Sequence, residues 1–414
     1  MTPELSVVGW LALLILALPI FFVTRQPDVW TILGVALVLR VGFVFYNTYI
    51  STLQTDDFEG YAAITSAYGW DSIWAVAGAN SKAYYFFCSL VYFGFGRNPL
   101  LLQNINVALS LASILLLIYT ARDIAGWRAA RLTGWAVALA PFSIIYSSVI
   151  LREATVIFPA VLGVRFWVLA MQQRRLIYHV ITLLCFGISA LFHYGCIALV
   201  FAWGLLPSVY HFLRQPTLLQ KVVTAGLAGL ASTIVLFVLY YFGVLDIFMA
   251  DKIELSELSA GGLGEGLQVA ARGRASYLHG LVIASPLDMA WQLPIRMVYL
   301  LFTPFPWMVE SLVDAAGFID ALIYLALILL CFLFYKRILR QPILVAMLVC
   351  FTLAIGVFSV GTSNYGTAIR HRAKFYPMLC LIAICAATMR EGPYFLHRTK
   401  IVPLRSRDLR TRSK

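Results

Sequence analysis

Two adjacent carboxylates, Asp56 and Asp57, are the residues of this sequence best suited to acid–base chemistry. They stand in the run Thr55-Asp56-Asp57-Phe58-Glu59-Gly60-Tyr61, inside a polar stretch of about 50 residues (50–100) between apolar segments. A carboxylate that reaches an attacking hydroxyl can take its proton, so Asp57, or Asp56, could act as general base. Asp56 and Glu59 also have the spacing of a helix-capping box. Both roles can hold together, with Asp56 capping a helix and Asp57 projecting beside Tyr61.

Four basic or potentially basic side chains follow one another in a second polar stretch, 361–374: Arg370, His371, Arg372 and Lys374. Guanidinium groups bind phosphate through two parallel hydrogen bonds, and an ammonium group adds a point charge. We therefore expect these four residues to bind a phosphate. The alternative is that the long basic side chains reach toward lipid headgroups.

Two short turns between apolar segments add polar residues. Arg152 could bind a phosphate while Glu153 orients it or an acceptor, and a solvated ion pair is the alternative. His193 and Tyr194 could line the same pocket, and a hydrogen-bonded histidine at the membrane interface is the competing interpretation.

The second long polar loop, 243–292, carries the basic residues Arg272 and Arg274. Beyond this loop, Pro304 and Pro306 would hold Trp307 in a fixed place through backbone rigidity. We expect these three side chains to line the pocket, with Trp307 shaping its lipid or sugar part.

No required cofactor is expected. Two adjacent carboxylates can hold Mg²⁺ or Mn²⁺, so a metal at Asp56 and Asp57 is possible, but the proton transfer does not need one. The seven cysteines have no zinc-binding spacing, and most fall in apolar segments where they pack as small apolar residues.

The elements that must position these residues are membrane helices. The chain is 61% hydrophobic and 12% charged, with a mean hydropathy of +0.86. At about 20 residues a span, it predicts an all-α polytopic membrane protein with about 11 transmembrane helices. The expected spans are 7–23, 30–49, 101–121, 132–150, 154–171, 177–192, 196–210, 222–242, 318–335, 343–360 and 375–389. The shorter segment 293–309 contains two prolines and is expected to be re-entrant or interfacial. Amphipathic helices are expected in the first loop, at 56–68 and 81–95.

The positions of the charges predict the orientation. Alternate turns and the C-terminal tail hold 19 of the 31 basic residues, whereas 14 of the 19 acidic residues lie on the opposite loops or their flanks. Under the positive-inside rule, the loops 50–100 and 243–292 form an outward active-site face of a membrane domain, 1–389, and the basic tail, 390–414, is cytoplasmic. We expect the tail to lie on anionic lipid.

The order of the motifs resembles the GT-C glycosyltransferases of the protein-mannosyltransferase-like superfamily. The motifs are Asp57-Phe-Glu-Gly-Tyr61, similar to the family's Asp-x-x-x-Tyr, then Phe95-Gly96-Arg97-Asn98-Pro99, Ala125-Gly126-Trp127-Arg128-Ala129-Ala130, Leu151-Arg152-Glu153 and Arg370-His371-Arg372-x-x-x-x-Pro377. The resemblance runs from Asp56 to Pro377. Phe58 stands where many members have Glu. We expect no large C-terminal soluble domain of the kind that many relatives carry, so that acceptor recognition would rest on the loops.

The resemblance implies a multi-span enzyme that moves a hexose or pentose from a polyprenyl-phosphate donor to a lipid-linked glycan, a polysaccharide or a protein. The reaction would take place on the outer face of a bacterial inner membrane, within cell-envelope polysaccharide synthesis. The family's catalytic base falls on Asp57, with Asp56 as second choice. Arg152, Arg370 and Arg372 would stabilise the departing phosphate. Nucleic acid is not an expected partner.

Two other functions fit part of the same pattern. An oligosaccharide or exopolysaccharide polymerase or ligase of the O-antigen type would also need outward Arg and His residues, for a lipid pyrophosphate, but would not need the Asp57 loop. A transporter or flippase should place ionisable residues near mid-bilayer in broken helices. Only Arg40 and Arg165 lie well inside the expected spans.

Overall fold

The computed structural model describes residues 3–51, 58–78, 81–204, 219, 274–278, 281 and 286–389. Within these residues the chain is almost entirely helical, and its one β-type pairing is a bridge between Ser276 and Asn364. Six described helices are long and apolar enough to cross a membrane. They are α1 (Pro3–Phe22), α2 (Pro27–Tyr49), α6 (Pro99–Ala125), α9 (Glu153–Gln173), α16 (Leu312–Leu333) and α18 (Pro342–Val360). An integral membrane protein is thereby supported, whereas the expected span at 222–242 lies outside the described residues.

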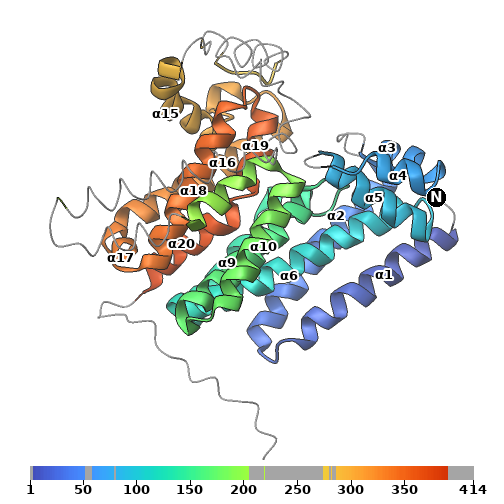
Figure 1. Ribbon diagram of the computed structural model, residues 1–414, viewed down its shortest axis with the longest axis horizontal. Coiled ribbons are helices and arrows are strands. Elements are labelled where there is room, and N and C mark those ends of the chain that lie inside the picture. Colours follow the sequence, from blue (N-terminus) through green and yellow to red (C-terminus); the bar gives the residue numbers. More distant parts are fainter. Residues whose placement is uncertain are drawn as a thin grey trace, which may run out of the picture.

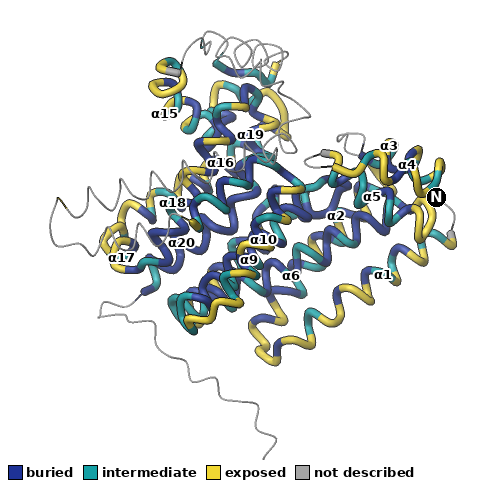
Figure 2. Tube along the Cα trace, in the orientation of Figure 1, coloured by how far each residue is buried: buried dark blue, intermediate teal, exposed yellow. Residues whose placement is uncertain are grey.

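Shorter apolar helices complete the described bundle: α10 (Leu176–Phe192), the stretch Tyr194–Gly204 and α20 (Tyr376–Thr388). Helix α6 is central and packs against α1, α2, α9 and α7 (Trp127–Leu139), while α20 packs against α16 and α7. About 72% of the most apolar part of α6 is buried but only 17% of that of α1, so the exposed apolar face of α1 is suited to lipid. Figure 2 shows the same contrast, with a mostly buried α6 above an α1 that is largely exposed.

The expected single span at 132–150 is wrong. The structure has two shorter helices there, α7 (Trp127–Leu139) and α8 (Pro141–Tyr146), which meet at an extended Ala140. Pro141 explains the break, because proline lacks a backbone N–H and disfavours the helical conformation of the residue before it. The break cannot be predicted from the apolar composition of 132–150 alone, because both helices are apolar.

The two helices expected in the first loop are present as α3 (Phe58–Ala67) and α5 (Ser81–Phe95), joined by the short α4 (Trp70–Ala75). The segment expected at 293–309 begins inside α15 (Pro286–Phe302), and the short helix η2 (Pro306–Met308) follows it. Helix α19 (Tyr365–Ala373) lies between α18 and α20. Figure 1 shows α3, α5 and α19 near the upper end of the bundle, with α17 (Tyr335–Arg340) toward the lower end.

The opposite end of the bundle holds basic turns. Arg131 of α7 pairs with Asp28 in the first turn of α2 at 3.0 Å, and Arg165 of α9 pairs with Asp123 in the last turn of α6 at 2.6 Å.

Candidate functional site

Glu153, the first residue of α9, is the centre of a buried charged cluster. Its Oε1 accepts hydrogen bonds from Arg370 Nε at 3.2 Å and from Lys374 Nζ at 3.3 Å. The side chains of Glu153 and Lys374 are each 1% exposed, whereas that of Arg370 is 23% exposed. The other carboxylate oxygen, Oε2, is buried and has no hydrogen-bond partner among the described residues. Glu153 can therefore hold two cations and still accept a further hydrogen bond.

Local helix geometry places both cations on the same side of α19. The side chain of Asn364 caps this helix by accepting from the N–H groups of Gly366 and Thr367. Arg370 and Lys374 are four residues apart, so their side chains share a face, and Lys374 Nζ also donates to the Arg370 carbonyl at 3.1 Å. Arg152, directly before α9, adds a third cation whose charge acts on Lys374.

Two histidines lie beside this cluster. The buried His193 ring is 4.6 Å from that of Phe358 and 5.3 Å from that of His371, which it meets edge to face. His371 Nδ1 is 2.9 Å from Thr362 Oγ1, and the Tyr194 ring is 5.6 Å from that of His193. The structure thus brings His193, Tyr194 and His371 to the same place as Lys374.

Burial lowers the pKa of two basic groups of this site, His193 and Lys374. It lowers the pKa of His193 well below its usual value, and the charges of Lys374 and Arg152 lower it further, so His193 is neutral. Burial also lowers the pKa of Lys374 to about 8, against the opposing effect of Glu153. An anion bound here would restore the charged form of Lys374.

Arg372 has a different place from the one that the sequence predicted. It is fully buried, and its guanidinium pairs with Asp320 at 2.8 Å. The same group donates to the carbonyls of Leu301, Thr303 and Gly317. These bonds join α15, α16 and α19, and a phosphate could reach Arg372 only by breaking them. Its geometry is that of a structural residue and not of a ligand-binding one.

The structure does not describe the predicted base, but it does describe the helix that follows it in the sequence. Asp56 and Asp57 fall outside the described residues, and α3 begins with the next residue, Phe58. Phe58 is buried, with its ring 5.0 Å from that of Tyr84. Asn106 Nδ2 in α6 is 3.5 Å from the Tyr84 hydroxyl and donates to the carbonyls of Val149 and Leu151.

Phe58 and Leu151 belong to the same cluster of buried apolar residues. This cluster anchors the start of α3 beside the turn that carries Arg152 and Glu153.

Glu59 and Tyr61, both expected in the pocket, lie on α3. Glu59 pairs with Arg97 at 2.8 Å and accepts from the Tyr92 hydroxyl at 3.1 Å. Tyr61 is half exposed, and its ring is 4.6 Å from that of Tyr85. Glu59 therefore links α3 to α5, while Tyr61 remains accessible.

The remaining predicted pocket residues come from the second half of the chain. Arg272 lies outside the described residues. Arg274 pairs with Asp314 at 2.7 Å and with Glu310 at 3.2 Å, while Asp314 also accepts from the Tyr365 hydroxyl at 3.0 Å. Together with the bridge between Ser276 and Asn364, these bonds fasten the segment 274–278 to the start of α19.

Trp307, in contrast, is 75% exposed and stacks on Phe305 at 4.9 Å. No contact among the described residues joins it to Glu153.

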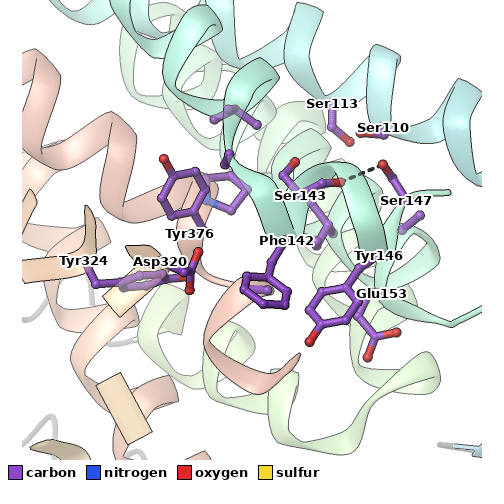
Figure 3. Close-up of a pocket in the computed structure, with 16 residues that line it drawn as sticks. Ser110, Ser113, Phe142, Ser143, Tyr146, Ser147, Glu153, Asp320, Tyr324 and Tyr376 are labelled. Carbon is purple, nitrogen blue, oxygen red and sulfur yellow. Dashed lines mark hydrogen bonds between the residues drawn. The ribbon is translucent and has the colours of Figure 1, made fainter. Parts of the chain in front are cut away.

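Next to the charged cluster, and lined in part by Glu153, is a small cavity of about 30 Å³, which has room for about two water molecules. Figure 3 shows Glu153 and Tyr146 on one side of it and Asp320 with Tyr324 on the other. A sugar or a lipid chain is too large for this space. Asp320 was not among the predicted site residues, although a carboxylate inside an apolar segment is itself a signal of a buried polar site.

The possibility of a metal site can be examined for the described residues. Among the described residues, no group of three or more His, Cys, Asp and Glu side chains could hold a metal ion. The two adjacent aspartates that could hold one are outside these residues.

Comparisons with known proteins give a structural likeness but no match in sequence. No family model matches the sequence, and no curated protein matches it. Among solved structures, the chain is similar to the crystal structure of ArnT from Cupriavidus metallidurans bound to undecaprenyl phosphate, with a TM-score of 0.43 and 17% sequence identity. The match covers 88% of this chain and 60% of that one, so this chain spans less than two thirds of that protein's length. A likeness at this level decides neither the family nor the activity.

Proposed function

We propose that the protein is a GT-C-type membrane glycosyltransferase that moves a sugar from a polyprenyl-phosphate donor to a glycan, lipid or protein acceptor. The observation that carries the proposal is the buried convergence of Arg370 and Lys374 on Glu153, next to Arg152. Three cations around one carboxylate at the end of a membrane bundle suit a phosphate whose lipid tail lies in the bilayer.

The proposed reaction is a direct displacement at the anomeric carbon. The acceptor hydroxyl gives its proton to Asp57 while its oxygen bonds to that carbon. The bond between the anomeric carbon and the phosphate oxygen breaks, and its electron pair leaves with the polyprenyl phosphate. With no covalent enzyme intermediate, the configuration at the anomeric carbon inverts.

The charges of these residues fit a monophosphate donor. Arg152, Arg370 and Lys374 against Glu153 and Asp57 leave one positive charge, which balances the single negative charge of a sugar phosphodiester. When Asp57 accepts the proton, two positive charges remain, and the departing phosphate monoester carries close to two negative charges. Because the net charge of the site balances that of the phosphate throughout the reaction, the site stabilises the transition state. A pyrophosphate donor would bring one more negative charge than these residues balance.

The other residues of the site have supporting roles in this proposal. Glu153 positions Arg370 and Lys374, and His371 and the neutral His193 offer hydrogen bonds to the phosphate or sugar. Arg372 is left out of the phosphate site, because its bonds hold α19 in place. Tyr61 and Arg274 face the acceptor side. We place this site on the periplasmic face of a bacterial inner membrane, with the tail 390–414 in the cytoplasm.

Lipid binding tests this proposal. The purified protein in detergent is titrated with polyprenyl monophosphate, polyprenyl pyrophosphate and the uncharged polyprenol of equal length. We expect the monophosphate to bind most tightly and the polyprenol at least about 10-fold more weakly, since one charged hydrogen bond contributes about 1.5–3 kcal/mol. Tighter binding of the pyrophosphate would favour the polymerase function instead, and equal affinities would contradict a phosphate site.

A further inference from the structure

Arg40 is a buried cation that the proposed reaction does not use. It lies in α2, 13 residues after the helix start at Pro27, or about 20 Å along a helix suited to crossing the membrane. Its side chain is fully buried. A charge at this depth is costly unless it is compensated. Among the residues that the structure describes, no carboxylate pairs with Arg40.

The bonds of Arg40 are all to neutral oxygens. Nη1 donates to the carbonyls of Ala36 and Ala138, each at 3.2 Å. Nε donates to Ser110 Oγ at 2.9 Å, and Nη2 donates to Ser143 Oγ at 3.0 Å. Part of this pattern is structural, since Ala138 lies in the last turn of α7, before the break at Pro141. The two serine bonds have a further consequence.

Ser110 and Ser143 are oriented as donors by the guanidinium. Because each hydroxyl oxygen accepts from Arg40, its own proton points elsewhere, and no described residue accepts it in a hydrogen bond. Both serines line the small cavity described above. Two other lining serines differ, because Ser113 donates to the Leu109 carbonyl at 2.8 Å and Ser147 to the Ser143 carbonyl at 2.6 Å.

The carboxylates that line the same cavity do not neutralise Arg40. Glu153 is held by Arg370 and Lys374, and Asp320 is held by Arg372. Figure 3 shows Ser110 and Ser143 away from Asp320, on the other side of the cavity. The part of the cavity next to the two serines therefore has hydroxyl donors that contact the guanidinium of Arg40, a cation without a carboxylate partner among the described residues.

We propose that this cavity binds a small inorganic anion, chloride under physiological conditions, between the hydroxyls of Ser110 and Ser143. The anion supplies the negative charge that Arg40 lacks in the described bundle, and it needs only two donors and a space slightly larger than one water. The site fixes α2, α6 and α8 to one another. It is independent of the proposed glycosyl transfer, because neither serine nor Arg40 belongs to the phosphate site.

The test is the halide dependence of thermal unfolding. The full-length protein is purified in sodium gluconate, and its unfolding midpoint is followed while chloride or bromide replaces gluconate at constant ionic strength. We expect a saturable rise of roughly 2–4 °C with either halide. Ser110→Ala and Ser143→Ala should each remove the rise, whereas the control Ser113→Ala should keep it. The same midpoint in gluconate and chloride, or loss of the rise only in Ser113→Ala, would overturn the proposal.

Anomalous scattering from bromide provides a direct second measurement. Crystals grown in sodium bromide should show one peak within hydrogen-bond distance of Ser110 Oγ and Ser143 Oγ. Water alone at that position would overturn the proposal, whatever the unfolding curves show.

Discussion

Replacing Lys374 with methionine is the sharpest perturbation of the charged cluster. Methionine keeps an unbranched side chain of similar length in a site where Lys374 is 1% exposed, and it removes only the charge and the hydrogen-bond donors. Glu153 keeps its bond to Arg370 at 3.2 Å, so the carboxylate is not left without a cation. The variant should therefore fold.

The expected effect is on donor affinity. Lys374 would contribute one charged hydrogen bond to the phosphate, which is worth about 1.5–3 kcal/mol. At about 1.4 kcal/mol per tenfold change, Lys374→Met should weaken the binding of polyprenyl phosphate by about 10- to 150-fold. Binding of the uncharged polyprenol, which offers no anion, should change less than about twofold.

Equilibrium binding of both lipids to the same protein preparations measures this difference. Lys82→Met is a matched control, because it removes a lysine from α5, outside the cluster. Equal affinities of the Lys374→Met and parent proteins for polyprenyl phosphate would refute the phosphate site. An equal loss for phosphate and alcohol would also refute it, since that result indicates altered packing.

Three further predictions concern the pH dependence of donor binding, the proposed base and the buried Arg372–Asp320 pair. Because burial lowers the pKa of Lys374 to about 8, polyprenyl-phosphate affinity should fall as pH rises above about 8. The unfolded chain holds that proton up to about pH 10.5, so the lysine's contribution to stability should rise over the same window, and Lys374→Met should lack both trends. Asp57→Asn should lower transfer by about 10²–10⁴-fold with lipid binding intact, whereas Asp56→Asn should cost less because Asn still caps a helix; the reverse order in a transfer assay would move the base to Asp56. Arg372→Met should lower the free energy of unfolding by about 3–5 kcal/mol, because it leaves Asp320 buried without its cation. Restored stability in Arg372→Met/Asp320→Leu would support that cause, and an unchanged unfolding midpoint in Arg372→Met would contradict it.

The sequence predicted which turns would meet but not which side chains would face each other. Alternate turns of antiparallel helices fall at the same end of a bundle, so Glu153, His193 and the stretch 361–374 could be expected together, and the structure brings them together. Choosing between Arg370 and Arg372 required the knowledge that this stretch is a helix. At about 100° per residue, two positions two apart point to nearly opposite faces, whereas Arg370 and Lys374 share one. The residues 361–364, Gly-Thr-Ser-Asn, are typical of a turn, so the sequence did not predict that a helix, α19, begins directly after them at Tyr365.

The polar contacts between helices were even harder to predict from the sequence. Asp320 and Arg372 are 52 positions apart, and nothing in the composition of either segment pairs them. Similarly, Asn106 bonds to carbonyls more than 40 positions away, at the turn before Arg152. Such pairs depend on the depth at which two helices place their residues, which hydrophobic periodicity does not encode.

The transfer reaction itself tests the central claim most directly. The purified protein is incubated with polyprenyl-phosphate sugars and candidate acceptors, and mass spectrometry follows the loss of donor and the release of polyprenyl phosphate. The proposed function predicts acceptor-dependent conversion of at least one polyprenyl-phosphate sugar to polyprenyl phosphate by the parent protein, with conversion nearly absent in Asp57→Asn. Consumption of a lipid pyrophosphate-linked glycan alone, or equal turnover by Asp57→Asn and the parent, would contradict it.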